Sequence, residues 1–149
     1  MSSKKEIKFA DFLAIQNLYS TYNFASDEGD ELNYAACFTQ DGILVSKEAG
    51  IYVCGHRELL AHKVADRQAR NGRYRRHWNA NLILTPLNNG KVQGKCYLLA
   101  YEAEQGEIPR ITDCGVYEDI LVKTNDSWKF EMRSIFMDAT TWKEKNKLI

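Results

Sequence analysis

Apolar side chains recur every three to four residues over residues 8–27, which is the pattern of an amphipathic helix that buries one face. The apolar and aromatic positions of this stretch are Phe9, Phe12, Leu13, Ile15, Leu18, Tyr19, Tyr22 and Ala25. Turn-forming residues at 27–30 end the helix, and Asp30 can cap a second, short helix that runs to about Phe38. A third helix is predicted over residues 56–70, where strong helix formers carry a single apolar stripe.

The remaining pattern predicts strands. Residues 38–42 are typical of a turn, and two short β-branched runs at 43–46 and 51–54 predict a hairpin. Long strands follow at about 74–87, 91–104, 110–123 and 127–138, separated by Gly, Pro, Asn and Asp clusters that suit an antiparallel meander. This order predicts an α+β fold, in which three N-terminal helices pack on one face of a strongly curved, mostly antiparallel sheet and enclose a pocket. The 149 residues fit a single domain, with residues 1–7 and 140–149 peripheral.

The strand that begins at Tyr74 carries polar groups on one face. Successive side chains of a strand point to opposite sides, so His77, Asn79 and Asn81 are expected to share the pocket face. Ile83 falls on the same face, and the opposite face is expected to carry Trp78, Ala80, Leu82 and Leu84. A bulge along so long a strand would shift these assignments by one residue.

Composition and charge exclude several classes of partner. The chain is 44% hydrophobic and 27% charged, and its 20 basic and 20 acidic side chains cancel. Nucleic-acid binding is therefore not expected, and the short basic run at 70–76 favours a solvated or salt-bridged strand entry. No apolar stretch approaches the length of a membrane span, and the N-terminus is polar, so we expect no membrane partner and a cytoplasmic location.

The cysteines and histidines indicate neither disulfides nor a metal. Cys37, Cys54, Cys96 and Cys114 form no C-x-x-C pair and are typical of buried thiols in a reducing compartment. A catalytic thiol is the less favoured alternative. The three histidines, at positions 56, 62 and 77, are scattered in the sequence. We predict that no metal or other cofactor is bound.

Several short motifs together resemble a known family. They are Ile15 to Tyr19 in the first helix, Tyr22 five residues before Asp27, Gly55 before the third helix, Arg76-His77, residues 115–119, Trp128 and Arg133. Their order and spacing resemble the SnoaL-like family of the nuclear-transport-factor-2-like superfamily, which includes scytalone dehydratase, bile-acid 7α-dehydratase, hexachlorocyclohexane dehydrochlorinase and polyketide cyclases. The resemblance implies a conical α+β barrel, a cofactor-independent reaction and a homodimer, with a trimer as the alternative. The activity varies widely within such a fold.

The resemblance also implies roles for individual residues. His77 and Asp27 match the imidazole and carboxylate dyad of the dehydratase-like members, and Tyr22 matches a helix tyrosine of the bile-acid dehydratase pattern. A neutral imidazole can take a proton from carbon while a carboxylate on its other nitrogen fixes the tautomer. The chain has no histidine after His77, so only a mechanism with one base is expected. Substrate contacts are predicted for Tyr19, Asn79, Asn81, Cys96 and Phe136.

These residues also have structural interpretations. His77 could be a satisfied structural histidine, Asp27 a turn or capping residue, and Tyr19 and Tyr22 core aromatics. Asp119 and Arg133 favour a structural ion pair across neighbouring strands. The preferred function is a lyase or isomerase of the dehydratase or cyclase kind, acting on a hydrophobic, oxygenated, cyclic small molecule. The alternative is a non-catalytic ligand-binding module, or a small accessory subunit of a ring-hydroxylating dioxygenase.

The outward face of the sheet predicts self-association. Its expected apolar positions are Trp78, Leu82, Leu84, Tyr97, Leu99 and Tyr101. A sheet one layer thick cannot leave so many large apolar side chains in water, so a second copy of the chain is expected to cover them.

Overall fold

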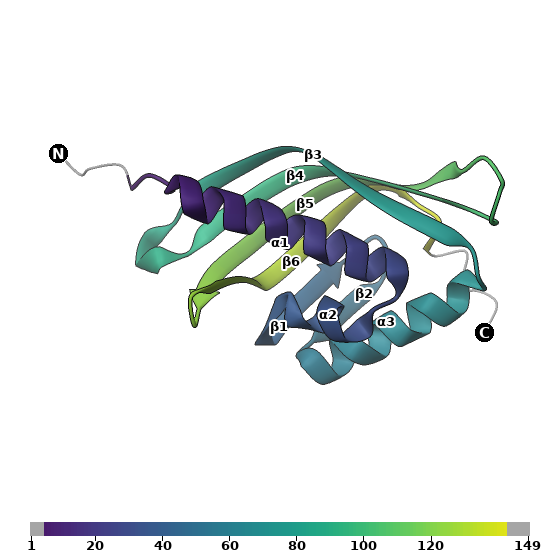
Figure 1. The fold of residues 1–149 in the computed structure, drawn as a ribbon, viewed down its shortest axis with the longest axis horizontal. Coiled ribbons are helices and arrows are strands. Elements are labelled where there is room, and N and C mark those ends of the chain that lie inside the picture. The colour runs from purple at the N-terminus through teal and green to yellow at the C-terminus, as the bar shows by residue number, and fades with distance from the viewer. Residues whose placement is uncertain (1–4, 143–149) are drawn as a thin grey trace.

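The structure is a computed structural model that describes residues 5–142 (Figure 1). Its helices are α1 (Phe9–Glu28), α2 (Glu31–Ala36) and α3 (His56–Arg70), with a short 3-10 turn, η1, at Asn88–Gly90. Its strands are β1 (Phe38–Ser46), β2 (Ile51–Cys54), β3 (Tyr74–Pro86), β4 (Val92–Ala103), β5 (Arg110–Thr124) and β6 (Ser127–Thr140). The predicted α+β class is confirmed. Of the segments predicted to be peripheral, residues 1–4 and 143–149 lie outside the described residues.

The strands form one open, curved sheet in the order β2-β1-β6-β5-β4-β3. Neighbouring strands are antiparallel except β1 and β6, which are parallel. Figure 1 shows β3 to β6 arching over α1, and α2 and α3 contact β1 at the other end of the sheet. The predicted curved, mostly antiparallel sheet with helices on one face is confirmed, and it is a half-open cone because β2 and β3 remain as edges.

Residues 38–42 were predicted as a turn but belong to β1, so that prediction is wrong. Phe38 pairs with Phe130 and Ile43 with Met132, and the register shifts between these two pairs. The polar residues between them therefore form an irregularity within the strand. Such an irregularity can have the same residue composition as a turn, which explains the prediction. The predicted bounds of α3 and β2 agree with the structure.

The core between α1 and the sheet contains a fully buried charge. Arg133 is 0% exposed, and its guanidinium donates to both oxygens of Asp119 on the neighbouring strand, at 3.0 and 2.8 Å. The predicted ion pair of these two residues is thus present. The hydroxyl of Tyr19 also donates to Asp119. It can reach across β4 because Gly94 has no side chain there, and a Cβ on Gly94 would lie 2.3 Å from the Tyr19 hydroxyl.

A bulge in β3 reverses the predicted faces of its second half. The pairing with β4 shifts between Ala80 and Ile83, and Asn81 takes a left-handed conformation with φ of 61°. Leu82 and Leu84, which were predicted to point outward, instead pack against the core, and Ile83 is exposed. Asn81 lies at the bulge itself and is exposed, so it is not in line with His77 and Asn79 along a regular strand.

Candidate active site

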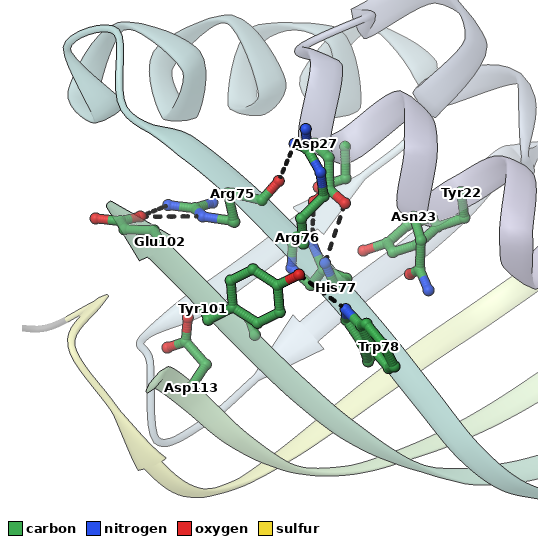
Figure 2. A network of polar contacts seen from close by, with 12 residues as sticks. Tyr22, Asn23, Asp27, Arg75, Arg76, His77, Trp78, Tyr101, Glu102 and Asp113 are labelled. Carbon is green, nitrogen blue, oxygen red and sulfur yellow. Dashed lines mark hydrogen bonds and ion pairs between the residues drawn. The ribbon is translucent and has the colours of Figure 1, made fainter. Parts of the chain in front are cut away.

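His77 on β3 and Asp27 in the last turn of α1 lie against each other (Figure 2). Asp27 Oδ1 lies 2.5 Å from His77 Nδ1, and Asp27 Oδ2 accepts the backbone N–H of His77 at 3.0 Å. Both side chains are largely buried, at 12% exposed for His77 and 6% for Asp27. The two residues are fifty positions apart, so this contact depends on how α1 and β3 pack.

The end of α1 is fixed by α3, and this positions Asp27. Arg70 on α3 donates to the backbone carbonyls of Asp27 at 2.7 Å and Ser26 at 3.3 Å, and Arg67 donates to Gly29 at 2.8 Å. These contacts satisfy carbonyls that a helix C-terminus leaves without partners. Gly29 ends the helix with φ of 69°, where a side chain would also strike Arg67.

The imidazole separates an inner cavity from an outer groove. His77 lines both, whereas Asp27 lines only the groove, together with Phe24, Trp78 and Tyr101. Because Nδ1 faces Asp27, the other ring nitrogen, Nε2, is free of Asp27 on a ring that lines both the cavity and the groove. Among the residues that the structure describes, Nε2 has no hydrogen-bond partner. The arrangement leaves a ring nitrogen that can accept a proton.

Two tyrosine hydroxyls meet at the same cavity. Tyr22 on α1 and Tyr34 on α2 lie 3.2 Å apart at their hydroxyl oxygens, and either can donate. Burial raises the pKa of both phenols above the ordinary value, although the nearby charge of Arg133 acts to lower that of Tyr22. Both are therefore neutral near pH ~7 and can donate a hydrogen bond to an oxygen in the cavity. Sequence reasoning selected Tyr22 and missed Tyr34, which lies in a short helix with too few residues for a periodic pattern.

The other predicted contact residues do not line this cavity. Tyr19 is held by Asp119 in the core, and Cys96 is buried there, where burial raises the pKa of its thiol to about 12. Asn79 accepts a hydrogen bond from Asn23 of α1 at 2.7 Å and lines the outer groove. Asn81, on the bulge, lines a separate recess beside Tyr19.

Phe136 lies on the outer face of the sheet, with 49% of its surface exposed. Its neighbours Ile135 and Met137 line the cavity instead. The prediction that Phe136 contacts a ligand in the cavity is therefore not compatible with its position. The cause is again a shift of register, because the pairing of β6 with β5 changes between Phe130 and Met132, opposite Leu121 and Ile120, and Phe136 follows this shift.

The basic run at 70–76 was expected to be solvated or salt-bridged, and its Arg75 belongs to a buried network of charges whose extent was not predicted. Lys63 of α3 donates to Asp66 at 3.0 Å, and Asp66 accepts from Arg75 of β3 at 2.8 Å. Arg75 also donates to Glu102 of β4, as the dashed lines in Figure 2 show. Lys63, Asp66 and Arg75 line the cavity. The sequence signal was the spacing of Lys63, Asp66 and Arg70 on one helix face, which is equally typical of a solvated face.

Among residues 5–142, no three or more His, Cys, Asp and Glu side chains are grouped so that they could hold a metal ion. Within the same range, no helix is both long and apolar enough to cross a membrane.

These features define an α+β domain with a cavity between its helices and its curved sheet, and the cavity is lined by two imidazoles and three phenols. Residues 8–134 match the family model described as the SnoaL-like domain, and the chain belongs to this family. No curated protein matches the chain at a significant level.

Solved structures share the fold at low sequence identity. ActVI-ORFA from Streptomyces coelicolor is 20% identical with a TM-score of 0.78, over 85% of this chain and 96% of that one. Aln2 from another Streptomyces strain is 18% identical with a TM-score of 0.81, over 90% and 95%. A scytalone dehydratase-like protein from Novosphingobium aromaticivorans is 22% identical with a TM-score of 0.76, over 89% and 87%. At these identities the likeness shows the fold alone.

Proposed function

We propose that the protein is a lyase or isomerase of the dehydratase or cyclase kind that needs no cofactor and uses His77 as its base. The observation that carries this proposal is the double contact of Asp27 with His77, through the ring at 2.5 Å and the backbone at 3.0 Å. A structural histidine needs only a satisfied ring, whereas this one keeps a ring nitrogen that has no partner among the described residues. The scytalone dehydratase-like neighbour agrees with this kind of chemistry.

The carboxylate of Asp27 favours the tautomer that carries its proton on Nδ1, which leaves the lone pair on Nε2. In the proposed reaction, Nε2 takes a proton from an activated carbon of the substrate. The electron pair of the broken C–H bond forms a new double bond as hydroxide departs, or is held by a neighbouring carbonyl. The imidazolium then gives its proton to the departing hydroxyl, which releases water, or to another carbon, which completes an isomerisation. Asp27 stabilises the imidazolium between these steps.

The lining of the cavity supports a hydrophobic and oxygenated substrate. Its apolar wall is formed by Leu44, Ile51, Leu98, Ile135 and Met137. The neutral phenols of Tyr22 and Tyr34 can donate to an oxygen that gains charge in the transition state. The cavity has a volume of about 60 Å³, so a cyclic substrate must displace side chains at its mouth.

The test begins with a search for ligands by thermal shift, with cyclic hydroxy ketones, hydroxy acids and their dehydrated products as the panel. For each ligand found, exchange of its carbon-bound hydrogens in deuterated water reports proton abstraction without knowledge of the product. We expect His77→Ala, with its fold intact, to lose on the order of 10² to 10⁴ in rate.

The matched control is His56→Gln, because the His56 Nε2 pairs with a backbone carbonyl at 3.0 Å and the residue does not line the cavity. This variant should retain its turnover. Near wild-type exchange or turnover in His77→Ala would refute the proposed mechanism.

The second candidate is a non-catalytic ligand-binding module, which the small volume of the cavity favours. It predicts saturable binding with no exchange of ligand hydrogens, and an affinity that His77→Ala changes no more than other cavity substitutions do.

The oligomeric state and location are part of the same proposal. The outer face of the sheet exposes Trp78 at 61%, Tyr97 at 59% and Leu99 at 37%, and we infer that a second copy covers them in a homodimer. We place the protein in the reducing cytoplasm as one SnoaL-like domain, since Cys37, Cys54, Cys96 and Cys114 are free thiols.

A further inference from the structure

We propose that the wall of the inner cavity formed by Lys63, Ser26 and Tyr34 is a subsite for a carboxylate group, and that the substrate is therefore a small carboxylic acid. The proposed link to catalysis rests on the role of His77 described above, but binding of the carboxylate does not.

Lys63 has a donor left for a ligand. Its ammonium group has three N–H donors. One goes to Ser26 Oγ at 2.8 Å and one to Asp66 at 3.0 Å, while the ring of Tyr34 lies 4.4 Å away at its centroid. Among the described residues, no further oxygen accepts from Nζ. The side chain is 3% exposed and lines the cavity. A buried ammonium is stabilised by an oxygen anion, and its hydrogen bonds to ionised acceptors are the strong ones.

Lys63 belongs to a cluster of buried charges. Lys63, Arg70, Arg73 and Arg75 form one connected cluster of ion pairs with Asp66 and Glu102, and the nearby charge of the Asp27 carboxylate acts on Arg70. Four cations meet three carboxylates there, which leaves one positive charge while His77 is neutral. Asp113 also faces the cavity, but it belongs to β5, and the hydroxyls of Thr112 and Thr140 donate to it at 3.1 and 2.6 Å.

The subsite lies close to the proposed base. Ser26, which holds Lys63, and Asp27, which holds His77, are consecutive residues whose Cα atoms are ~3.8 Å apart. Lys63 and His77 line the same cavity, and its volume of about 60 Å³ suits a carboxylate group better than a whole ring. The geometry thus fits an acid whose activated C–H bond lies a few bonds from the carboxylate.

The experiment is a titration of the intact wild-type protein, followed by NMR, with sodium acetate, acetamide and sodium chloride at matched ionic strength. Acetate and acetamide have the same shape and differ in charge. We expect acetate to shift the signals of Lys63, Ser26 and His77 in a saturable way. The affinity for acetamide should be lower than that for acetate by a factor of about ten or more, because acetamide offers no charged acceptor. Chloride should not reproduce the acetate shifts.

Equal binding of acetamide and acetate, or no binding of either, would overturn the subsite. So would acetate shifts confined to the surface lysines Lys5, Lys8 and Lys91, which lie around the start of α1. Lys63→Met should abolish the preference for acetate over acetamide, and a retained preference would count against the proposal. If Lys63→Met does not fold, the wild-type titration decides whether the subsite exists: acetate shifts at Lys63, Ser26 and His77 support it, and acetate shifts elsewhere refute it.

A second variant separates this inference from the proposed function. His77→Ala should lose turnover but still bind acetate with the wild-type preference over acetamide. Acetate binding in a His77→Ala protein of unchanged turnover would refute the catalytic role and leave the subsite standing.

Discussion

Asp27 holds His77 at two points, since one carboxylate oxygen accepts its backbone N–H at 3.0 Å and the other pairs with its ring Nδ1 at 2.5 Å. A single hydrogen bond would let the imidazole rotate about it. The second bond ties the carboxylate to the main chain of β3, so the orientation of the ring follows from the packing of α1 on the sheet. Such preorganisation is what a catalytic base requires, because a small misplacement reduces the rate strongly.

Asp27→Asn should remove the base function while keeping the shape of the site. An asparagine offers one oxygen and one amino group, so it can accept from only one of the two donors of His77. If its oxygen keeps the backbone N–H, its amino group faces Nδ1 and favours the tautomer that is protonated on Nε2. We expect a loss on the order of 10² to 10⁴ in kcat, the range for a wrong tautomer or a lost acid-base group. Nitrogen NMR shifts of the imidazole measure the tautomer directly.

Glu28→Gln is the matched control, since Glu28 is the next residue on α1 and is exposed. This substitution removes the same negative charge as Asp27→Asn. It should leave both the imidazole shifts and the rate unchanged. An Asp27→Asn protein with the wild-type tautomer and rate would contradict the proposed dyad.

The sequence was sufficient for the helices, for the strands apart from the first half of β1, and for the position of His77 in β3, and the reason is local. The three-to-four-residue spacing of Ile15, Tyr19 and Tyr22 is set by the helix itself, and His77 lies before any irregularity in β3. Asn81 and Phe136 lie at or beyond register shifts. A single bulge exchanges the faces of every later residue, and the sequence does not mark its position.

Lys63 illustrates a second limit. Its partners are Ser26 of α1 and Asp66 of its own helix, and Asp66 in turn depends on Arg75 of β3. Each of these residues alone is typical of a helix surface or a strand end. The burial of the Lys63 ammonium becomes evident only when α1, α3 and β3 are assembled, because a buried charge needs its partners in place.

The exposed apolar side chains on the outer face of the sheet predict a homodimer, and a single substitution there should prevent its formation. Trp78, Tyr97 and Leu99 are exposed on adjacent strands, with Trp78 paired to Leu99 in register. Tyr97→Lys would place a charge among these apolar side chains, so we expect a monomer by analytical ultracentrifugation where the wild type is a dimer. Phe9→Lys is the control, because Phe9 is exposed on α1 and lies away from this face. A monomeric wild type, or a Tyr97→Lys dimer of unchanged stability, would contradict the prediction.

The buried pair of Arg133 and Asp119 should be essential for stability. Arg133→Met leaves the carboxylate of Asp119 in the core with only the Tyr19 hydroxyl as a donor from a side chain. Removing one partner of a buried ion pair destabilises a protein by about 3–5 kcal/mol. Urea unfolding measures the loss. Glu31→Ala is the control, since Glu31 of α2 and Arg67 of α3 pair at 3.1 Å near the surface of the helix layer, and an exposed pair contributes at most about 1 kcal/mol. Similar losses in both variants would contradict the interpretation.

The last prediction concerns His62, whose ring packs against that of Trp142 in a tilted arrangement at a centroid distance of 5.7 Å. Burial, together with the nearby charge of Lys63, lowers the pKa of His62 from 6.5 to about 4. The unfolded chain therefore binds a proton at a higher pH than the folded protein does. Stability that is present above pH 6.5 should be lost as the pH falls from 6.5 towards 4. At about pH 5 the loss would be about 2 kcal/mol.

The measurement is the free energy of unfolding at about pH 7.5 and about pH 5, for the wild type and for His62→Gln. Carboxylates titrate in both proteins. The difference between the pH dependence of the wild type and that of His62→Gln therefore isolates the contribution of His62. The charges of Lys63 and Arg75 outweigh burial and lower the pKa of Asp66, which keeps this neighbour ionised throughout the range. We expect the wild type to lose more stability on acidification than His62→Gln does. An equal loss in both proteins would mean that His62 titrates in the folded protein as it does in the unfolded chain.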